Sequence, residues 1–136
     1  MGNEMTEILL FLHQLPQNML GLVIIKITGA VKTVRDYEYV AYNYNYFGVS
    51  LGDYIIFGHK GPDIISYKHE RGHRRQSLYL GWLYLIVIGL PSLIGNIWDR
   101  VFHASWSAER RIDWYYSLPV EKWADQLGGV KRWRIL

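Results

Sequence analysis

The chain has 136 residues, five histidines, no cysteine and a formal net charge of +3. This length predicts a single domain over residues 1–136. Without cysteine there is no disulfide framework, thiolate zinc finger or cysteine nucleophile, so a bound metal must use His and carboxylate ligands. The small charge, with no long basic tract, argues against a nucleic-acid partner. Hydrophobic residues make up 50% of the chain and gather in long blocks, which indicates a lipid bilayer as partner.

The first apolar block, residues 8–25, has no formal charge and just suffices to span a bilayer. We therefore predict a membrane anchor helix over 8–30. Its polar centre is unusual, because polar groups at that depth usually face protein or a wet cavity. We interpret it as a kink whose side chains bond to a neighbour, with a direct role in substrate handling as the alternative. The polar centre consists of His13, Gln14, Pro16, Gln17 and Asn18.

The segment 36–58 has a different pattern, in which tyrosines recur with period two between glycines. This pattern is typical of strands. We expect a small antiparallel β element of two or three strands. Its turns are expected near Gly48, Gly52 and 58–61.

The next segment, 62–98, combines a polar helix with a second apolar block. Pro62 and Asp63 suit the first turn of a helix. The uncharged stretch 76–98 follows directly, and we expect it to be membrane-embedded or re-entrant.

The polar helix carries the sequence KHERGH, residues 68–73. Residues four apart project from one helix face, so His69 and His73 can bind one metal ion with Glu70 beside them. Glu70 would then lie near a metal-bound water, and the spacing fits a zinc hydrolase.

A third ligand is needed, because a catalytic zinc typically has three protein ligands and one open position. The helix predicted over 117–128 contains EKWAD, in which Glu121 supplies that ligand. Asp125 lies one helical turn further and can accept a hydrogen bond from a ligating histidine.

Together, HERGH and EKWAD resemble the HExxH and ExxAD motifs of gluzincin metallopeptidases. The closest type is the membrane-bound one that includes the CAAX prenyl protease and the HtpX-like heat-shock proteases. The resemblance implies zinc ligands at His69, His73 and Glu121, a general base at Glu70 and an orienting carboxylate at Asp125. It also implies a β element before the HExxH helix, with an edge strand that holds an extended peptide.

The metal site restricts the topology of the second block. If 78–98 crossed the bilayer once, His73 and Glu121 would lie on opposite sides of a layer about 30 Å thick. We therefore expect a membrane-embedded hairpin with a break at 90–92. Burial against the first block and a site sunk in the membrane are the alternatives.

The sequence does not identify which residue would donate a hydrogen bond to the oxyanion. The candidate donors are His103, Arg110, Arg111, Tyr115 and Tyr116. The basic stretch 131–135 is interpreted as a tail that touches anionic lipid. Because the chain is short, a second copy of it in a homo-oligomer could complete the sides of the active-site cleft.

Fold and function are thus expected as an α+β integral membrane zinc metalloendopeptidase acting on a peptide or a membrane-proximal protein segment. The distribution of Lys and Arg favours a cytoplasmic active site. The alternatives are a non-enzymatic membrane-associated binding or immunity-type protein, with HERGH as a basic interfacial helix, and a protease that binds metal without turnover.

Overall fold

The computed structural model describes residues 2–35, 38–42, 48–58 and 63–132. Two helices come first, α1 (Gly2–His13) and α2 (Leu15–Thr28). Four strands follow: β1 (Val31–Arg35), β2 (Glu38–Tyr42), β3 (Val49–Leu51) and β4 (Tyr54–Phe57). The rest is helical: α3 (Ile64–Leu80), a 3₁₀ turn (Gly81–Leu83), a π-helical segment (Leu85–Gly89), α4 (Leu90–Phe102), α5 (Ala108–Ser117) and α6 (Pro119–Gly128).

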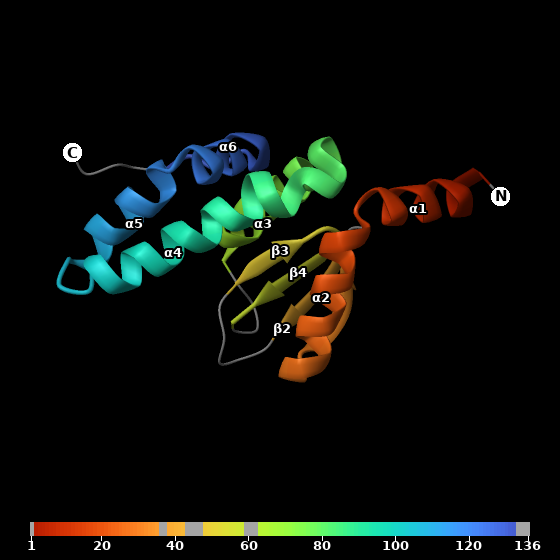
Figure 1. The fold of residues 1–136 in the computed structure, drawn as a ribbon, viewed down its shortest axis with the longest axis horizontal. Coiled ribbons are helices and arrows are strands. Elements are labelled where there is room, and N and C mark those ends of the chain that lie inside the picture. Colours follow the sequence, from red (N-terminus) through yellow and green to blue (C-terminus); the bar gives the residue numbers. More distant parts are fainter. Residues whose placement is uncertain (1, 36–37, 43–47, 59–62, 133–136) are drawn as a thin grey trace.

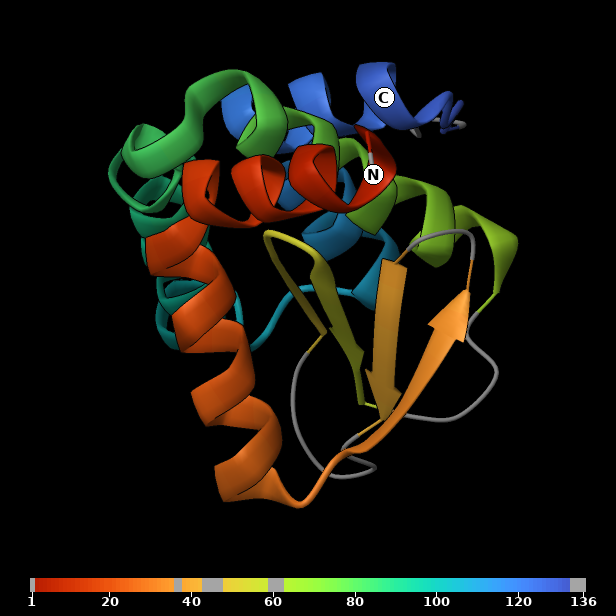
Figure 2. The same cartoon turned by 90° about the vertical axis from the view of Figure 1, so that its right-hand side faces the viewer.

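Helices dominate, and the small sheet lies between α1 on one side and α4 and α5 on the other along the long axis of the molecule (Figure 1). α3 lies between the sheet and α6 (Figure 1) and contacts both β3 and α6. α2 packs against β3 and β4, as Figure 2 shows from the end of the molecule. The predicted α+β class is confirmed.

The sheet is mixed, with strand order β1-β2-β4-β3, so the antiparallel prediction was wrong. β2 and β4 pair in parallel, while β1–β2 and β3–β4 are antiparallel. The sheet begins at Val31, before the predicted start at 36, and residues 36–37 and 43–47 lie outside the described part. The turn predicted at Gly52 is present, with φ of 65°. Residues 59–61 of the last predicted turn are also outside the described part.

The core between the sheet and α3 is built from Val40, Ile55, Phe57 and Tyr67. All four residues of β4, YIIF, are buried, which is typical of a central strand covered on both faces. This packing fixes the position of α3 relative to the sheet.

The first apolar block forms two helices bent by 85°, and not the single helix predicted over 8–30. Gln14 stands at the break, where its Nε2 donates to Asp53 Oδ1 at 3.1 Å. Gln17 Nε2 donates to Ser77 Oγ at 2.8 Å and to the Gly81 carbonyl at 2.9 Å. The interpretation of the polar centre as a kink bonded to its neighbours is confirmed.

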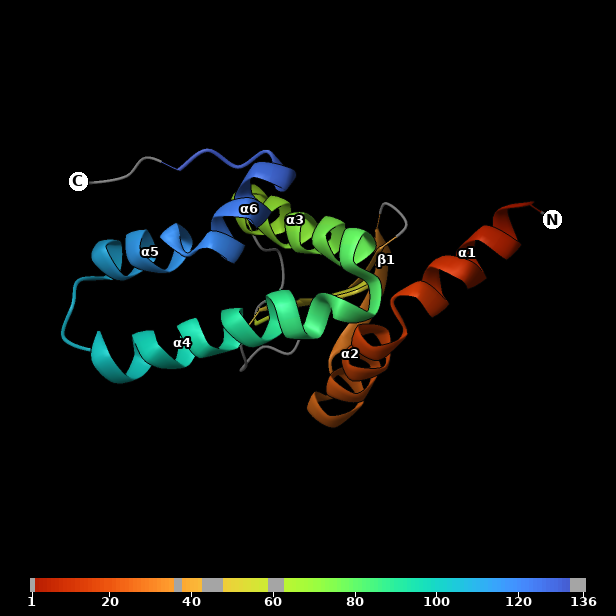
Figure 3. The ribbon, with the colours of Figure 1, turned by 45° about the horizontal axis from the view of Figure 1, so that its top comes forward.

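The second apolar block reverses direction at Gly81, and not at the predicted 90–92. Gly81 has φ of 55°, and a Cβ there would lie 2.7 Å from the His13 ring. Pro91 lies at the start of α4, directly after the π-helical segment Leu85–Gly89, and the helix continues through it. α5 then returns along α4 (Figure 3), so the two ligand motifs lie on the same side without a break in α4.

In the described part, the continuous helix Leu85–Phe102 has the length and composition to cross a membrane. The bent pair α1 and α2 meets the same criteria only when its halves are taken together.

Candidate metal centre

The two motifs meet because two glycines let α3 and α6 approach closely. A Cβ on Gly72, within HERGH, would lie 1.9 Å from the Ala124 carbonyl oxygen, within EKWAD. A Cβ on Gly128 would lie 2.0 Å from the Lys68 carbonyl oxygen. α3 begins where sequence predicted, since the Asp63 side chain accepts from the Ser66 N–H at 2.8 Å. Both motifs are therefore presented by ordered helices in backbone contact.

The three predicted ligands converge on one point. The Nε2 atoms of His69 and His73 lie 3.0 and 2.9 Å from Glu121 Oε2. Donor atoms around a tetrahedral zinc with bonds of about 2.0–2.1 Å are roughly 3.3 Å apart, so only a small expansion is needed to admit the ion. The three side chains are buried, with Glu121 fully enclosed.

Both imidazoles are oriented from their other nitrogen. His69 Nδ1 lies 2.7 Å from Asp125 Oδ1, as the sequence predicted. His73 Nδ1 lies 2.7 Å from Gln76 Oε1, and Gln76 Nε2 donates to the Val120 carbonyl at 2.9 Å. With each Nδ1 serving as the donor, each Nε2 is left to face the centre.

Gln76 was missed by sequence reasoning. The available signal was its spacing of three from His73, which places both on one helix face.

The second oxygen of Glu121 is held by two hydroxyls. Tyr115 donates to Glu121 Oε1 at 3.0 Å, Ser92 Oγ makes a short hydrogen bond to the same atom, and the two hydroxyls are 3.0 Å apart. Burial and the nearby Glu121 charge raise the pKa of Tyr115, so its hydroxyl is a donor at neutral pH. The carboxylate thus has one oxygen fixed by α4 and α5 and the other directed at the histidines.

The proton equilibria of the centre reflect strong pairing. Burial alone would lower the pKa of His69, but hydrogen bonds to Asp125 and Glu121 raise it to about 9. Burial alone would raise the pKa of Glu121, but hydrogen bonds from His69 and His73 hold it far below its ordinary value. At neutral pH these shifts favour protonated histidines paired with the ionised Glu121 carboxylate.

Glu70 has a carboxylate oxygen, Oε2, that is covered and has no hydrogen-bond partner in the described structure. Burial raises the pKa of this carboxyl, and the nearby charges of His73 and His69 oppose that rise. A carboxylate with a free, desolvated oxygen beside a metal centre has the properties expected of a general base.

Arg132 completes the surroundings of Asp125, although the sequence interpretation assigned it to a lipid-binding tail. Its Nε donates to Asp125 Oδ2 at 2.7 Å and its Nη2 donates to Oδ1 at 3.2 Å. Its guanidinium also lies 3.5 Å from the ring centroid of Tyr116, whose edge packs on His69. Residues 133–136 of that tail lie outside the described part.

The five candidate oxyanion donors fall into two groups. Tyr115 and Tyr116 contact the centre, and burial raises the pKa of Tyr116 to about 12, so it too keeps its proton. The other three gather at the far end of α4, where His103 stacks on Trp106 at 3.6 Å and Arg111 donates to Asp99 at 2.8 Å. The Arg110 guanidinium lies 3.8 Å from the Trp106 ring centroid. The structure brings only the two tyrosines to the ligands.

An apolar groove of about 440 Å³ lies between α4, α5 and α6. It is lined by Pro91, Ile94, Gly95, Trp98, Trp114, Leu118, Pro119 and Val120. Pro91, Trp114 and Val120 directly precede Ser92, Tyr115 and Glu121 in the chain. The flank of the centre formed by α4 and α5 is therefore apolar.

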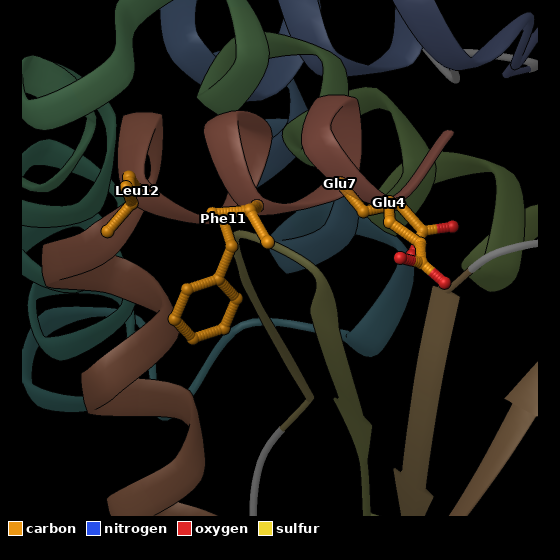
Figure 4. Close-up of a pocket in the computed structure, with 5 residues that line it drawn as sticks. Glu4, Glu7, Phe11 and Leu12 are labelled. Carbon is orange, nitrogen blue, oxygen red and sulfur yellow. The ribbon is translucent and has the colours of Figure 1, made fainter. Parts of the chain in front are cut away.

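A second hollow, of about 420 Å³, lies on α1 and is shown in Figure 4. It is lined by Glu4, Glu7, Ile8, Phe11 and Leu12, all from that one helix. None of these residues contributes to the metal centre.

Comparisons of the chain with protein-family models, with curated proteins and with solved structures gave no match.

Proposed function

We propose that the protein is a membrane-attached zinc metalloendopeptidase. The observation that carries this proposal is the convergence of His69 and His73 Nε2 on Glu121 Oε2, at 3.0 and 2.9 Å. The three ligand atoms of this group lie within 4.8 Å of one another. Glu70, with its covered and unpartnered oxygen, is next to His69 in the chain.

The donor set fits zinc. Two imidazole nitrogens and one carboxylate oxygen are ligands of borderline and hard character, and three protein ligands leave one position open, as catalytic zinc requires. When bound, zinc supplies a Lewis acid that polarises a carbonyl and acidifies a coordinated water.

The side chains around the proposed zinc site have separate roles in hydrolysis. Glu70 accepts a proton from the attacking water and delivers it to the leaving amine. Asp125 and Gln76 keep the imidazoles in the tautomer that turns Nε2 to the centre. Tyr116 stays protonated at neutral pH and packs against the His69 ring, so it is a candidate for the oxyanion donor.

Attachment to a bilayer is supported by the large apolar side chains that α1, α2 and α4 expose. An active site on the cytoplasmic side agrees with the seven Lys and Arg residues between positions 32 and 75. The substrate would be a polypeptide segment close to the membrane.

The alternative of a non-enzymatic binding protein has less support. It treats HERGH as a solvated interfacial helix, whereas His69 and His73 are 3% and 6% exposed and both are paired with carboxylates.

Zinc analysis of detergent-purified protein tests the proposal. We expect about one zinc per chain in the wild type and a clear loss in His73→Ala and Glu121→Gln, because each removes one of three ligands. Glu70→Gln is the matched control, since it should keep zinc and yet fail to cleave an unfolded protein substrate.

Two results would reject the proposal. Folded wild-type protein without zinc above background, never exposed to chelator, would exclude the metal centre. Zinc with cleavage that survives Glu70→Gln would exclude the peptidase mechanism.

A further inference from the structure

α4 is amphipathic, with an apolar stripe whose side chains are exposed in the described structure. Nine exposed side chains recur every three or four residues along the helical segment: Ile86, Val87, Leu90, Leu93, Ile94, Ile97, Trp98, Val101 and Phe102. The opposite stripe is polar and consists of Ser92, Asn96, Asp99 and His103. This arrangement is typical of helices that lie in the plane of a membrane interface.

The polar stripe is turned toward the rest of the protein. Ser92 is bonded to Tyr115 at 3.0 Å and Asp99 to Arg111 at 2.8 Å, which fixes α5 antiparallel to α4. Figure 3 shows α5 and α6 together on one side of α4. Ile94 and Trp98, at one edge of the apolar stripe, line the groove toward α5 and α6. Leu93, Ile97 and Val101 lie on the part of the helix turned away from Ser92 and Asp99.

The position of the candidate metal centre argues against the helix Leu85–Phe102 spanning the bilayer. Ser92, which is bonded to Glu121, stands 1.5 residues from the midpoint of the candidate span Leu85–Phe102, or about 2 Å along the helix axis. If the helix crossed the bilayer, the centre would lie near the midplane. The charged side chains of Lys68, Arg75 and Lys122 are exposed, and each stands within two residues of a proposed ligand. Each such charge near the midplane costs about 2.5–3.5 kcal/mol on insertion scales.

The N-terminal helices are too short to cross separately. α1 has 12 residues and α2 has 14, or about 18 and 21 Å, against a hydrocarbon layer of about 30 Å. Gln14 and Gln17 hold the 85° bend through buried hydrogen bonds to Ser77, so the two helices cannot straighten without breaking these bonds.

We propose that α4 lies flat in the interface of one leaflet, with its apolar stripe in the lipid and the metal centre on the aqueous side. This inference rests on the membrane attachment included in the proposed function. Arg100 and Arg110 are exposed near one end of the stripe and complement anionic headgroups. The partner is thus an anionic bilayer surface, and the substrates are polypeptide segments held next to it.

Vesicle binding tests the stripe. The probe is vesicles of three parts phosphatidylcholine to one part phosphatidylglycerol, and the readout is co-flotation of the purified protein. Leu93→Asp and Ile97→Asp should each weaken binding by about tenfold or more, because each removes one large apolar side chain from the lipid. Ile112→Asp on α5 is the matched control, since Ile112 is 50% exposed against 55% and 53% for Leu93 and Ile97. It should leave binding unchanged.

Depth measurements separate a flat helix from a crossing one. The chain has no cysteine, so single cysteines can be placed at Ile86, Leu93 and Val101 and spin-labelled in the same vesicles. A flat helix gives three similar, shallow depths. A deep value at Leu93 with shallow values at Ile86 and Val101 would show a crossing and overturn the proposal.

Other outcomes also decide the matter without any measurement of activity. Absence of vesicle binding, or equal loss in Ile112→Asp, would overturn the proposal. So would a lipid-free dimer that Leu93→Asp converts to a monomer, which would assign the stripe to a second copy of the chain. None of these results depends on zinc or cleavage, so failure here is distinguishable from failure of the peptidase proposal.

Discussion

Gln76 fixes the orientation of the His73 imidazole, a proposed zinc ligand whose ring the motif alone leaves free to rotate. Its Oε1 lies 2.7 Å from His73 Nδ1 while its amide is tied to Val120. We predict that Gln76→Ala weakens zinc binding by about 10–100-fold, as loss of such orienting partners typically does. Competition against a chromophoric chelator measures the change in Kd. Gln76→Glu, which keeps the acceptor, should retain most of the affinity, and exposed Gln126→Ala should retain all of it. An unchanged Kd in Gln76→Ala would show that His73 is held by other contacts.

Zinc bound at the proposed centre would have to displace a proton from His69. Because hydrogen bonds to Asp125 and Glu121 outweigh burial and raise the pKa of His69 to about 9, the metal-free protein carries that proton at pH 7. The raised pKa stabilises the metal-free fold fully below about pH 6.5, and this stabilisation is lost as pH rises through about 9. Zinc affinity should change in the opposite sense and increase by up to about tenfold per pH unit between pH 7 and 9.

Titration calorimetry in two buffers of different ionisation enthalpy would report the released proton. Affinity that is constant from pH 7 to 9, with no proton release, would contradict the assignment of His69 as a protonated ligand.

The contact between α3 and α6 depends on the absence of a side chain at Gly72. We predict that Gly72→Ala destabilises the fold by about 1–3 kcal/mol or more, because its Cβ would lie 1.9 Å from a backbone oxygen that cannot move freely. Thermal unfolding in mild detergent measures the loss, and zinc content should fall with it because the ligands separate. Gly89→Ala is the control, since its Cβ would find the nearest atom at 3.5 Å. Equal stability of the two variants would contradict this account of the helix contact.

At the scale of elements, capping and boundary residues in the sequence were sufficient to predict α3 and α6. They were not sufficient to predict the strand order or the bend between α1 and α2. Asp63 caps the helix that carries HERGH, and Pro119 and Gly129 bound the helix that carries EKWAD. The order of strands was not predictable, because the alternation of tyrosines does not specify which strands pair. The bend at Gln14 depends on Asp53, which is 39 residues away, so hydropathy along the block could not reveal it.

At the scale of the whole molecule, the sequence predicted which residues gather at the candidate metal centre, but it did not predict the side chains that surround them. His69, His73, Glu121 and Asp125 follow from two short motifs, each within one helix. Ser92 and Arg132 reach the centre only because α4 and the segment after α6 fold back against it. Such contacts between distant segments leave no periodic trace in the sequence.

Because Glu121 is bonded to side chains from α3, α4 and α5, zinc bound there should stabilise the entire domain and not a local loop. At free zinc of 1,000 times Kd the stabilisation is about 4 kcal/mol, which corresponds to a rise in Tm of roughly 14 °C for a domain of this size. Differential scanning fluorimetry before and after chelation measures it, and the shift should be larger at pH 8.5 than at pH 6.5 because fewer protons compete. Glu70→Gln should keep the shift, whereas His73→Ala should lose it. Loss of the zinc-dependent rise in Tm in Glu70→Gln, with the rise kept in His73→Ala, would show that the metal binds elsewhere. The roles assigned to Glu70 as base and His73 as ligand would then be wrong.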